Sequence, residues 1–323
     1  MDFIRRRILV SIIAFIAVLH LDFILPRLVP GSAAEIFASG TKLPSVAVKL
    51  IEARLGLDQP LYIQYFLYLK GIFATWPPYF GVSYQYYPAT VSSLIAQKLP
   101  WTILLIASAL ILSSVISFIL AGITSLRRGS SVEFGSVYAS IVFWATPAFW
   151  IGMILIFTFG ITLGVLPISG NVGFNVTSGP DYFYSVFVHA ILPIITLTAV
   201  IFGQNYILLR GAVQEVLKTD YVVAAKIRGL PNSVIQFGYI VRNSLLPIVP
   251  LLGYSVASLI SASVLVESVF GYSGLGDLIV DAIVNRDYPV LEGAFFYVTI
   301  IVIVGSLIGD LLILRLDPRL RQQ

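Results

Sequence analysis

Long stretches without a charged side chain are the feature that most limits what this sequence can fold into. A helix that crosses the roughly 30 Å hydrocarbon core of a membrane needs about 20 mostly apolar residues, and several stretches reach that length. Of the 323 residues, 58% are hydrophobic and 11% are charged, whereas soluble domains carry about 25% charged residues. So few charges could not cover a water-facing surface, and the sequence therefore predicts an integral membrane protein.

Six stretches are apolar enough to be read as membrane-spanning helices. The third is followed by a loop rich in Gly, Pro and Asn that extends to about residue 188. The predicted fold class is an all-α polytopic membrane protein with six transmembrane helices. These spans are predicted at residues 8–29, 99–126, 134–160, 189–209, 243–266 and 293–314.

The distribution of Lys and Arg predicts the orientation of these spans. Cytoplasmic segments carry an excess of basic residues, so the N-terminus is placed in the cytoplasm, and both termini are then cytoplasmic. Arg27 and Arg286 oppose this assignment. The 13 of 20 basic residues that lie inside are Arg5, Arg6, Arg7, Arg127, Arg128, Arg210, Lys218, Lys226, Arg228, Arg242, Arg315, Arg319 and Arg321.

The first apolar stretch has a second interpretation, as a cleaved signal peptide. Three arginines precede it and small residues at 31–33 follow it, but its length exceeds that of a usual signal core. The sequon Asn175-Val176-Thr177 lies in a loop assigned outside, which agrees with six spans and would accept a glycan only in a host that glycosylates such sites.

Two segments outside the membrane are too long to be simple connections. Residues 1–98 are interpreted as an N-terminal transmembrane helix plus an external segment, and residues 99–323 as a five-helix core. Within the external segment, residues 57–68 predict a tyrosine-rich helix started by Pro60, because proline is favoured in a first turn. This helix is expected at the membrane interface or against a partner.

A short cytoplasmic helix is predicted at about residues 220–229, between the fourth and fifth spans. Thr219 or Asp220 can cap its start, and Gly229 followed by Pro231 ends it. With no core of its own to join, the helix is expected to dock on another protein.

Motifs for enzyme chemistry are missing from the sequence. The chain has two histidines and no cysteine, so no zinc or thiol site can be assembled from a recognised motif. No Gly-Lys dipeptide occurs, so there is no P-loop, and any ATP must be bound by another subunit. Basic residues in short clusters between apolar runs indicate membrane orientation instead of nucleic-acid binding.

Three acidic residues fall in or beside predicted spans. Carboxylates at such positions are costly and tend to face a cavity or a partner. Asp22, Glu267 and Asp310 are therefore candidates for a polar substrate path. The alternative is local pairing of Asp22 with Arg27 and of Asp310 with Arg315.

Several spaced motifs resemble the permeases of ABC importers of the dipeptide and oligopeptide (and nickel) family. The cytoplasmic helix is similar to their E-A-A loop, although Val223 stands where the motif name has Glu. The early first span resembles the B-type subunit. The matching segments, which cover nearly the whole chain, are Leu55–Pro60, Leu163–Gly170, Asp220–Leu230, Arg242–Pro247, Glu267–Phe270, Gly274–Gly276, Asp281–Ile283, Arg286–Pro289 and Leu316–Arg319.

The resemblance implies a transport mechanism and a set of partners. In such importers a second related (C-type) permease completes the pathway, two ATP-binding subunits hold ATP and Mg, and an extracytoplasmic protein delivers substrate. The chain itself would bind no cofactor and no metal and would not be an enzyme. Its coupling residues would be Asp220, Tyr221, Ala224, Ala225, Lys226, Arg228, Gly229 and Leu230, and its gate or binding-protein interface Gly274, Gly276, Arg286, Asp287 and Tyr288.

The substrate class stays open at this point. Members of the family handle peptides, oligosaccharides or nickel complexes, and much of the specificity lies in the binding protein. An ion-coupled secondary transporter that uses Asp22 and Asp310 is the alternative from another class.

Overall fold

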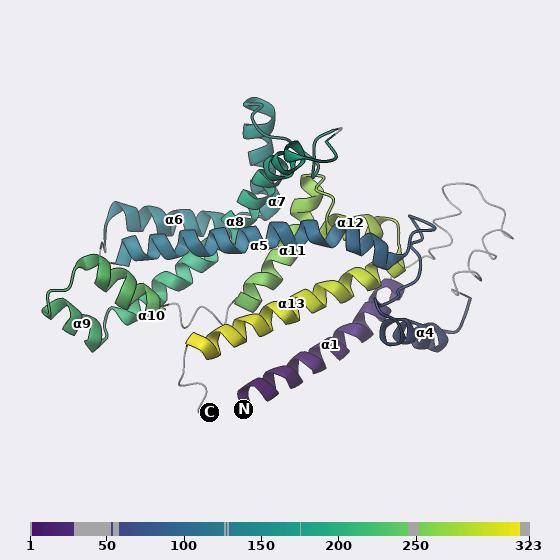
Figure 1. Cartoon of the computed structure of the whole chain (residues 1–323), viewed down its shortest axis with the longest axis horizontal. Coiled ribbons are helices and arrows are strands. Elements are labelled where there is room, and N and C mark those ends of the chain that lie inside the picture. The colour runs from purple at the N-terminus through teal and green to yellow at the C-terminus, as the bar shows by residue number, and fades with distance from the viewer. Residues whose placement is uncertain are drawn as a thin grey trace. The chain divides into compact units, whose positions relative to one another are not determined.

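The computed structural model describes residues 2–28, 53, 58–125, 127, 129–174, 176–244 and 252–316 (Figure 1). This part of the chain is almost entirely helical and contains no β-strand, with one isolated bridge between Val82 and Thr90. The elements are α1 (Asp2–Leu28), α4 (Leu61–Ala74), α5 (Val91–Ser125), α6 (Ser131–Ala145), α7 (Ala148–Leu155), the π-helix η1 (Ile156–Thr162), α8 (Pro180–Val216), α9 (Asp220–Ile227), the π-helix η2 (Val234–Val241), α10 (Arg242–Ser244), α11 (Leu252–Val269), α12 (Leu275–Val284) and α13 (Tyr288–Leu316).

Four helices in the described residues are long and apolar enough to cross a membrane. A fifth crossing results if α6 and the α7–η1 pair form one broken span. Helix α11 is also apolar, but its apolar stretch, Gly253–Val269, is shorter than these four helices. The all-α membrane class is thus observed, and four or five of the six predicted spans are found among the described residues. The four long spans are Arg5–Leu28, Val91–Ser125, Pro180–Val216 and Tyr288–Leu312.

The third predicted span is not a straight helix. The chain bends by 105° between α6 and α7, where Thr146 is extended at φ −89° and ψ 129° and Pro147 precedes α7. Proline lacks an amide proton and disfavours the helical conformation of the residue before it. The bend therefore follows from Pro147, which the prediction of one span across 134–160 ignored.

The fourth span begins earlier than its hydropathy suggested. Helix α8 starts at Pro180, not near residue 189, and Gly179 at φ 82° turns the chain into it. Proline suits a first helical position because the amide there has no partner within the helix, and the carboxylate of Asp181 in the first turn favours the same end. The predicted fifth span covers residues 243–266, of which residues 245–251 lie outside the described part of the chain. Helix α11 forms the rest of this span from Leu252.

The chain divides into two compact units. The first contains residues 1–5, 103–272 and 301–323, and the second contains residues 6–102 and 273–300. The second unit thus combines the N-terminal region with a segment near the C-terminus, a grouping that chain order alone does not express.

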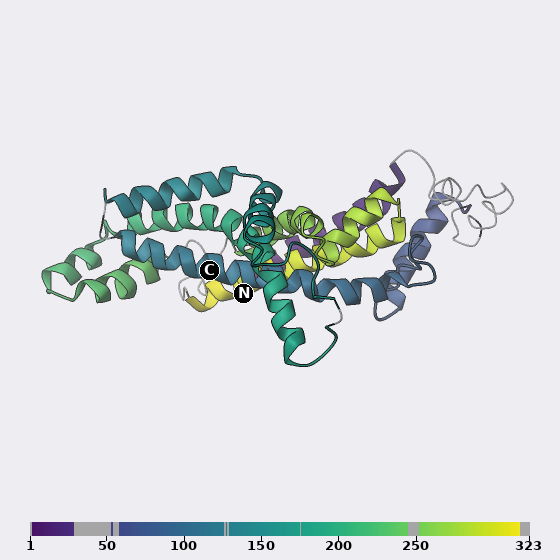
Figure 2. The same cartoon turned by 90° about the horizontal axis from the view of Figure 1, so that it is seen from above.

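Close contact between α6 and α8 organises the first unit (Figure 2). A Cβ atom on Gly203 of α8 would lie 2.4 Å from the Ser140 carbonyl oxygen and 2.9 Å from the Trp144 backbone nitrogen. Both atoms belong to the backbone of α6 and cannot move independently of that helix. The absence of a side chain at Gly203 is therefore what allows the two helices to approach.

Gly203→Ala should destabilise the first unit by about 1–3 kcal/mol, the usual cost of overpacking. Gly211→Ala is the matched control, because Gly211 lies on the same helix and its added Cβ would meet no atom within 4 Å. That control should be neutral or slightly stabilising, since alanine favours helix more than glycine. Thermal unfolding of the purified variants measures the difference, and equal unfolding temperatures would contradict the close packing.

Candidate functional site

The backbone conformation and hydrogen bonds at both ends of helix α9 define where it begins and ends. Thr219 takes the extended N-cap conformation, but its hydroxyl donates to the Val216 carbonyl oxygen at 2.6 Å instead of capping the helix. At the other end Gly229 has φ 70°, its amide donates to Lys226, and the Leu230 amide donates to Ala225. These two bonds form a Schellman motif, in which a left-handed residue closes the helix. The predicted end of the helix at Gly229 is confirmed.

One face of α9 packs into the protein's own core. Val222 and Ala225 are buried in an apolar cluster with Tyr206, Leu209 and Val213 of α8. Ile235 and Ile240 of η2 complete that cluster. The expectation that this helix has no core of its own was therefore wrong: the cluster fixes α9 to the end of α8.

The opposite face of α9 is exposed and largely apolar. Ala224 is exposed, and Ile227 has an exposed fraction of 81%. Tyr221 and Val223 are also exposed. Of the predicted coupling residues, Ala225 is thus buried in the chain's own core, and Leu230 is half-buried. The others face solvent: Asp220, Tyr221, Ala224, Lys226, Arg228 and Gly229.

An ion pair connects α6 with α8 in the same unit. Glu133 is buried and accepts from the guanidinium of Arg210 at 2.7 and 2.9 Å. Its other oxygen accepts from the Gly129 amide at 2.8 Å. Charge-assisted bonds of this kind are stronger than neutral ones, so the pair holds the start of α6 against the helix that carries α9.

A buried aspartate organises the second unit. Asp287 has an exposed fraction of 1% and accepts hydrogen bonds from the Ser83 hydroxyl and, at 3.0 Å, from the Gln85 amide. It precedes α13, whose Val290 amide donates to it at 3.4 Å. The carboxylate therefore joins the segment of residues 79–90, called here the segment after α4, to the start of the α13 span.

The residues on either side of Asp287 support this junction. Arg286 is in the left-handed region at φ 51°, and the buried ring of Tyr288 lies 6.4 Å from that of Tyr84. The predicted cluster of residues 286–288 is thus brought together as a structural unit. The prediction did not include Ser83 or Gln85, and no local pattern could have found them, because about 200 residues separate them from Asp287.

The glycines of the predicted gate lie at the start of α12. Gly274 occupies the N-cap position and Gly276 is buried inside the first turn. Leu275 lies between them, and its amide donates to the hydroxyl oxygen of Thr102 at 2.7 Å. Thr102 was not among the predicted site residues, yet it connects this turn to α5.

Helix α12 also contacts the segment after α4 through its exposed face. The Tyr86 hydroxyl donates to the Asp281 carboxylate at 2.6 Å. This hydrogen bond, together with partial burial, raises the pKa of Tyr86 to about 12. The contact is therefore intact at neutral pH and is lost as the pH rises through about 12, because the deprotonated phenol can no longer donate.

The acidic residues predicted for a substrate path are all buried, and Asp22 does not form the expected pair with Arg27. Arg27 forms its ion pair with Glu292 of α13, not with Asp22. One carboxylate oxygen of Asp22 has no hydrogen-bond partner in the described part of the chain. Glu267 and Asp310 are also buried, and the side chain of Arg315 lies outside the described residues.

The pair of Arg27 with Glu292 is the main site that sequence reasoning missed. Arg27 also donates to the Phe23 carbonyl oxygen at 2.6 Å, and its guanidinium carbon lies 3.6 Å from the centre of the Phe23 ring. Gln64 of α4 accepts from Arg27 at 3.3 Å. Arg27 thus joins α1, α4 and α13. Among the described residues, no group of three His, Asp or Glu side chains could hold a metal ion.

Comparison with known proteins identifies the family. Residues 113–322 match the model for the inner membrane component of binding-protein-dependent transport systems, and residues 1–106 match the model for the N-terminal part of such components. The chain belongs to this family. It is a multi-pass transport component of a cell membrane, and members of this family are permease subunits of ABC transporters.

Curated relatives of this membrane component match it from end to end. It is 31% identical to the oligopeptide transport system permease protein AppB of Bacillus subtilis, over 98% of both chains. It is also 31% identical to the di/tripeptide transport system permease protein DppB of Pseudomonas aeruginosa, over 100% of this chain and 99% of the relative. A probable peptide ABC transporter permease, y4tP of Sinorhizobium fredii, is 32% identical over 99% of both chains.

Asp287→Asn should loosen the segment after α4 in this membrane component. Hydrogen bonds to a charged group contribute about 1.5–3 kcal/mol, and the amide replaces a carboxylate that accepts several donors. Thermal unfolding and limited proteolysis at residues 79–90 measure the effect. Asp281→Asn on α12 is the control, because Asp281 holds the same segment through Tyr86, and it should cost less because Tyr86 is exposed. Equal effects of the two substitutions would show that the buried carboxylate has no special role.

Proposed function

We propose that this chain is the B-type permease subunit of an ATP-driven peptide importer. The observation that carries the proposal is end-to-end similarity to three permeases whose names specify oligopeptide, di/tripeptide and peptide transport. Two related permeases, this one and a C-type subunit, would form the pathway, with two ATP-binding subunits on the cytoplasmic side and an extracytoplasmic binding protein outside.

In this proposal the chain crosses the membrane six times and both termini are cytoplasmic. The bent α6 and α7–η1 pair serves as one crossing and α11, with the residues before it, as another. Helix α9 and the pair of Arg210 with Glu133 then lie in the cytoplasm, while α4 and α12 lie outside. The positions of the basic residues support this orientation.

The exposed face of α9 is the proposed contact with an ATP-binding subunit. Ala224 is small enough to allow close approach, and Ile227 offers an apolar side chain that nothing in the described chain covers. Exposed apolar residues that cluster on one face mark interaction sites. Because Val222 and Ala225 anchor the other face on α8, movement of the ATP-binding subunit would be passed directly to that span.

The second unit is proposed to hold the outer side of the pathway. Asp287 keeps the segment after α4 against the start of α13, and Asp281 holds the same segment to α12. The turn at Gly274 and Gly276 is held to α5 through Thr102. Asp22, Glu267 and Asp310 remain candidates for contact with a polar substrate. This chain would bind no cofactor, and ATP and Mg would be held by the partner subunits. Oligosaccharide or nickel-complex transport is the alternative for the same permease role.

Impermeant thiol reagents can test the proposed orientation. The chain has no cysteine, so a single introduced cysteine reports its own position. Trp76→Cys, at a side chain that is 92% exposed, should react in intact cells. Ile227→Cys should react only after the membrane is permeabilised. The reverse pattern would overturn the orientation without affecting the family assignment.

Ile227→Asp and Ala224→Arg should weaken the contact of the permease with its ATP-binding subunits. A charge at a desolvated interface costs several kcal/mol if it is left unpaired, so copurification of those subunits should fall at least tenfold. ATP hydrolysis stimulated by the loaded binding protein should fall with it. Both sites are exposed, so folding of the permease should be unaffected.

Val284→Asp is the matched control, because this α12 side chain is also exposed and apolar and lies on the opposite side of the membrane in the proposal. It should leave copurification unchanged. Ala225→Arg is not a clean test, since a buried charge would disrupt the cluster that fixes α9 to α8. Full copurification with Ile227→Asp would show that the coupling contact lies elsewhere.

A further inference from the structure

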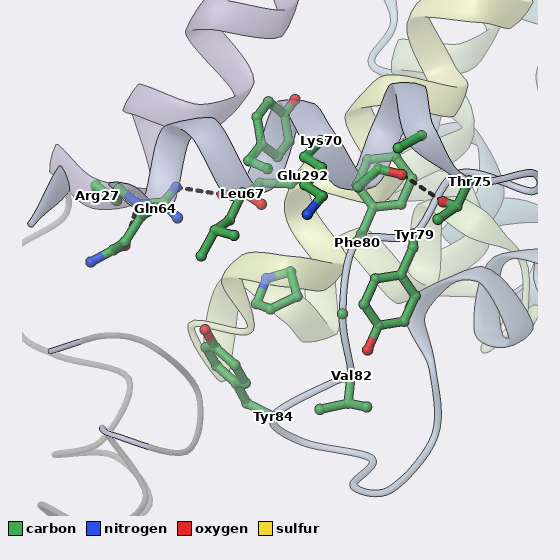
Figure 3. A pocket seen from close by; sticks show the side chains of 15 residues that line it. Arg27, Gln64, Leu67, Lys70, Thr75, Tyr79, Phe80, Val82, Tyr84 and Glu292 are labelled. Atoms are coloured by element: carbon green, nitrogen blue, oxygen red, sulfur yellow. Dashed lines mark hydrogen bonds and ion pairs between the residues drawn. The ribbon is translucent and has the colours of Figure 1, made fainter. Parts of the chain in front are cut away.

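A hollow in the second unit has the chemistry of a ligand site that transport does not require. The cavity has a volume of about 530 Å³ and lies between α4 and the segment of residues 79–84 (Figure 3). Arg27 and Glu292 also line it. Arg27 is next to the last residue of the α1 span, and Glu292 lies in the second turn of the α13 span. The cavity is therefore at the level where these two spans leave the membrane.

The charged groups of the cavity leave one positive charge without a partner. Two of the lining side chains are basic and one is acidic, and the acidic Glu292 is already paired with Arg27. Lys70 has no ion-pair or hydrogen-bond partner among the described residues. It projects from α4 toward the hollow beside Leu67, across from Tyr84 and Val82 (Figure 3). A ligand of the cavity should therefore carry a negative charge.

Apart from Gln64 and Thr75, the rest of the lining is aromatic or apolar. Tyr79, Phe80 and Tyr84 contribute rings, and tyrosine is enriched where proteins meet the membrane–water interface. Exposed apolar side chains also lie close in sequence to lining residues, with Leu25 and Leu28 on either side of Arg27 on α1 and Phe66 just before Leu67 on α4. An anion bound here would thus have an apolar surface beside it, which suits an amphiphile better than a free ion.

We propose that this cavity binds the headgroup of an anionic phospholipid. The lipid phosphate would lie at the Lys70 ammonium, a compact charge suited to phosphate, and its acyl chains would follow the exposed side chains of α1 and α4. A short zwitterionic peptide fits less well, because its ammonium group would need a free carboxylate and Glu292 is occupied by Arg27. The proposal does not depend on which solute the importer carries.

The test compares lipid retention by the complete purified transporter. The wild-type complex is reconstituted in nanodiscs of phosphatidylcholine and phosphatidylglycerol, extracted, and examined by native mass spectrometry for the lipid that stays bound. Lys70→Ala should lower the retention of phosphatidylglycerol about fivefold, the effect of one basic residue near an anionic lipid. Lys70→Arg should restore it. Lys218→Ala removes the same charge from an exposed position in the first unit and should change nothing.

A second variant keeps the test valid if Lys70→Ala does not assemble. Leu67→Trp adds volume at the exposed edge of the cavity without altering a charge, and it should also lower the retention of phosphatidylglycerol. Equal retention by wild type, Lys70→Ala and Leu67→Trp would overturn the proposal. Displacement of the lipid from wild type by inorganic phosphate alone, or by a dipeptide alone, would also overturn it, because the site would then belong to a free anion or to a solute.

Discussion

The requirement that every backbone polar group be hydrogen-bonded inside an apolar membrane is the constraint on which the rest of this structure depends. Hydrocarbon offers no partner for a free amide or carbonyl group, so a spanning segment is a helix unless other protein groups replace its bonds. The described part of this chain is accordingly helical throughout its apolar stretches. Where the helix is interrupted, at Thr146 and Pro147, the Thr146 amide and hydroxyl both donate to the Val142 carbonyl oxygen. The regular i→i−4 pattern thus continues up to Thr146 and stops at Pro147, which has no amide to donate.

The two faces of the short helix α9 lie in different surroundings, one buried and one exposed. Its buried face, with Val222 and Ala225, is part of the core of the first unit. Its exposed face, with Ala224 and Ile227, is free of contacts within that core. A helix that hung on flexible links could move without moving a span. Fixed to Tyr206 and Leu209 of α8, it moves with that helix, which suits the coupling role proposed for it.

Buried charges tie the second unit together in a comparable way. Asp287 holds the segment after α4 through hydroxyl and amide donors, and Arg27 joins three helices through Glu292, Phe23 and Gln64. Removing one partner of such a buried pair leaves an uncompensated charge, which is strongly destabilising. These groups therefore stabilise a junction at the ends of spans, where apolar packing alone would not select one arrangement.

The sequence by itself determined the membrane class, the approximate place of the long spans and the end of α9 at Gly229, because hydropathy and glycine act locally. It also identified Asp287 and its neighbours through motif resemblance. It could not show that Pro147 bends a span by 105°, since proline inside an apolar run is compatible with a kink or a break. Only the tertiary structure decided that Ala225 faces inward, that Arg27 pairs with Glu292 instead of Asp22, and that Ser83 and Thr102 belong to the same junctions. These contacts join residues far apart in the chain, and no local pattern encodes which distant donor a buried carboxylate will find.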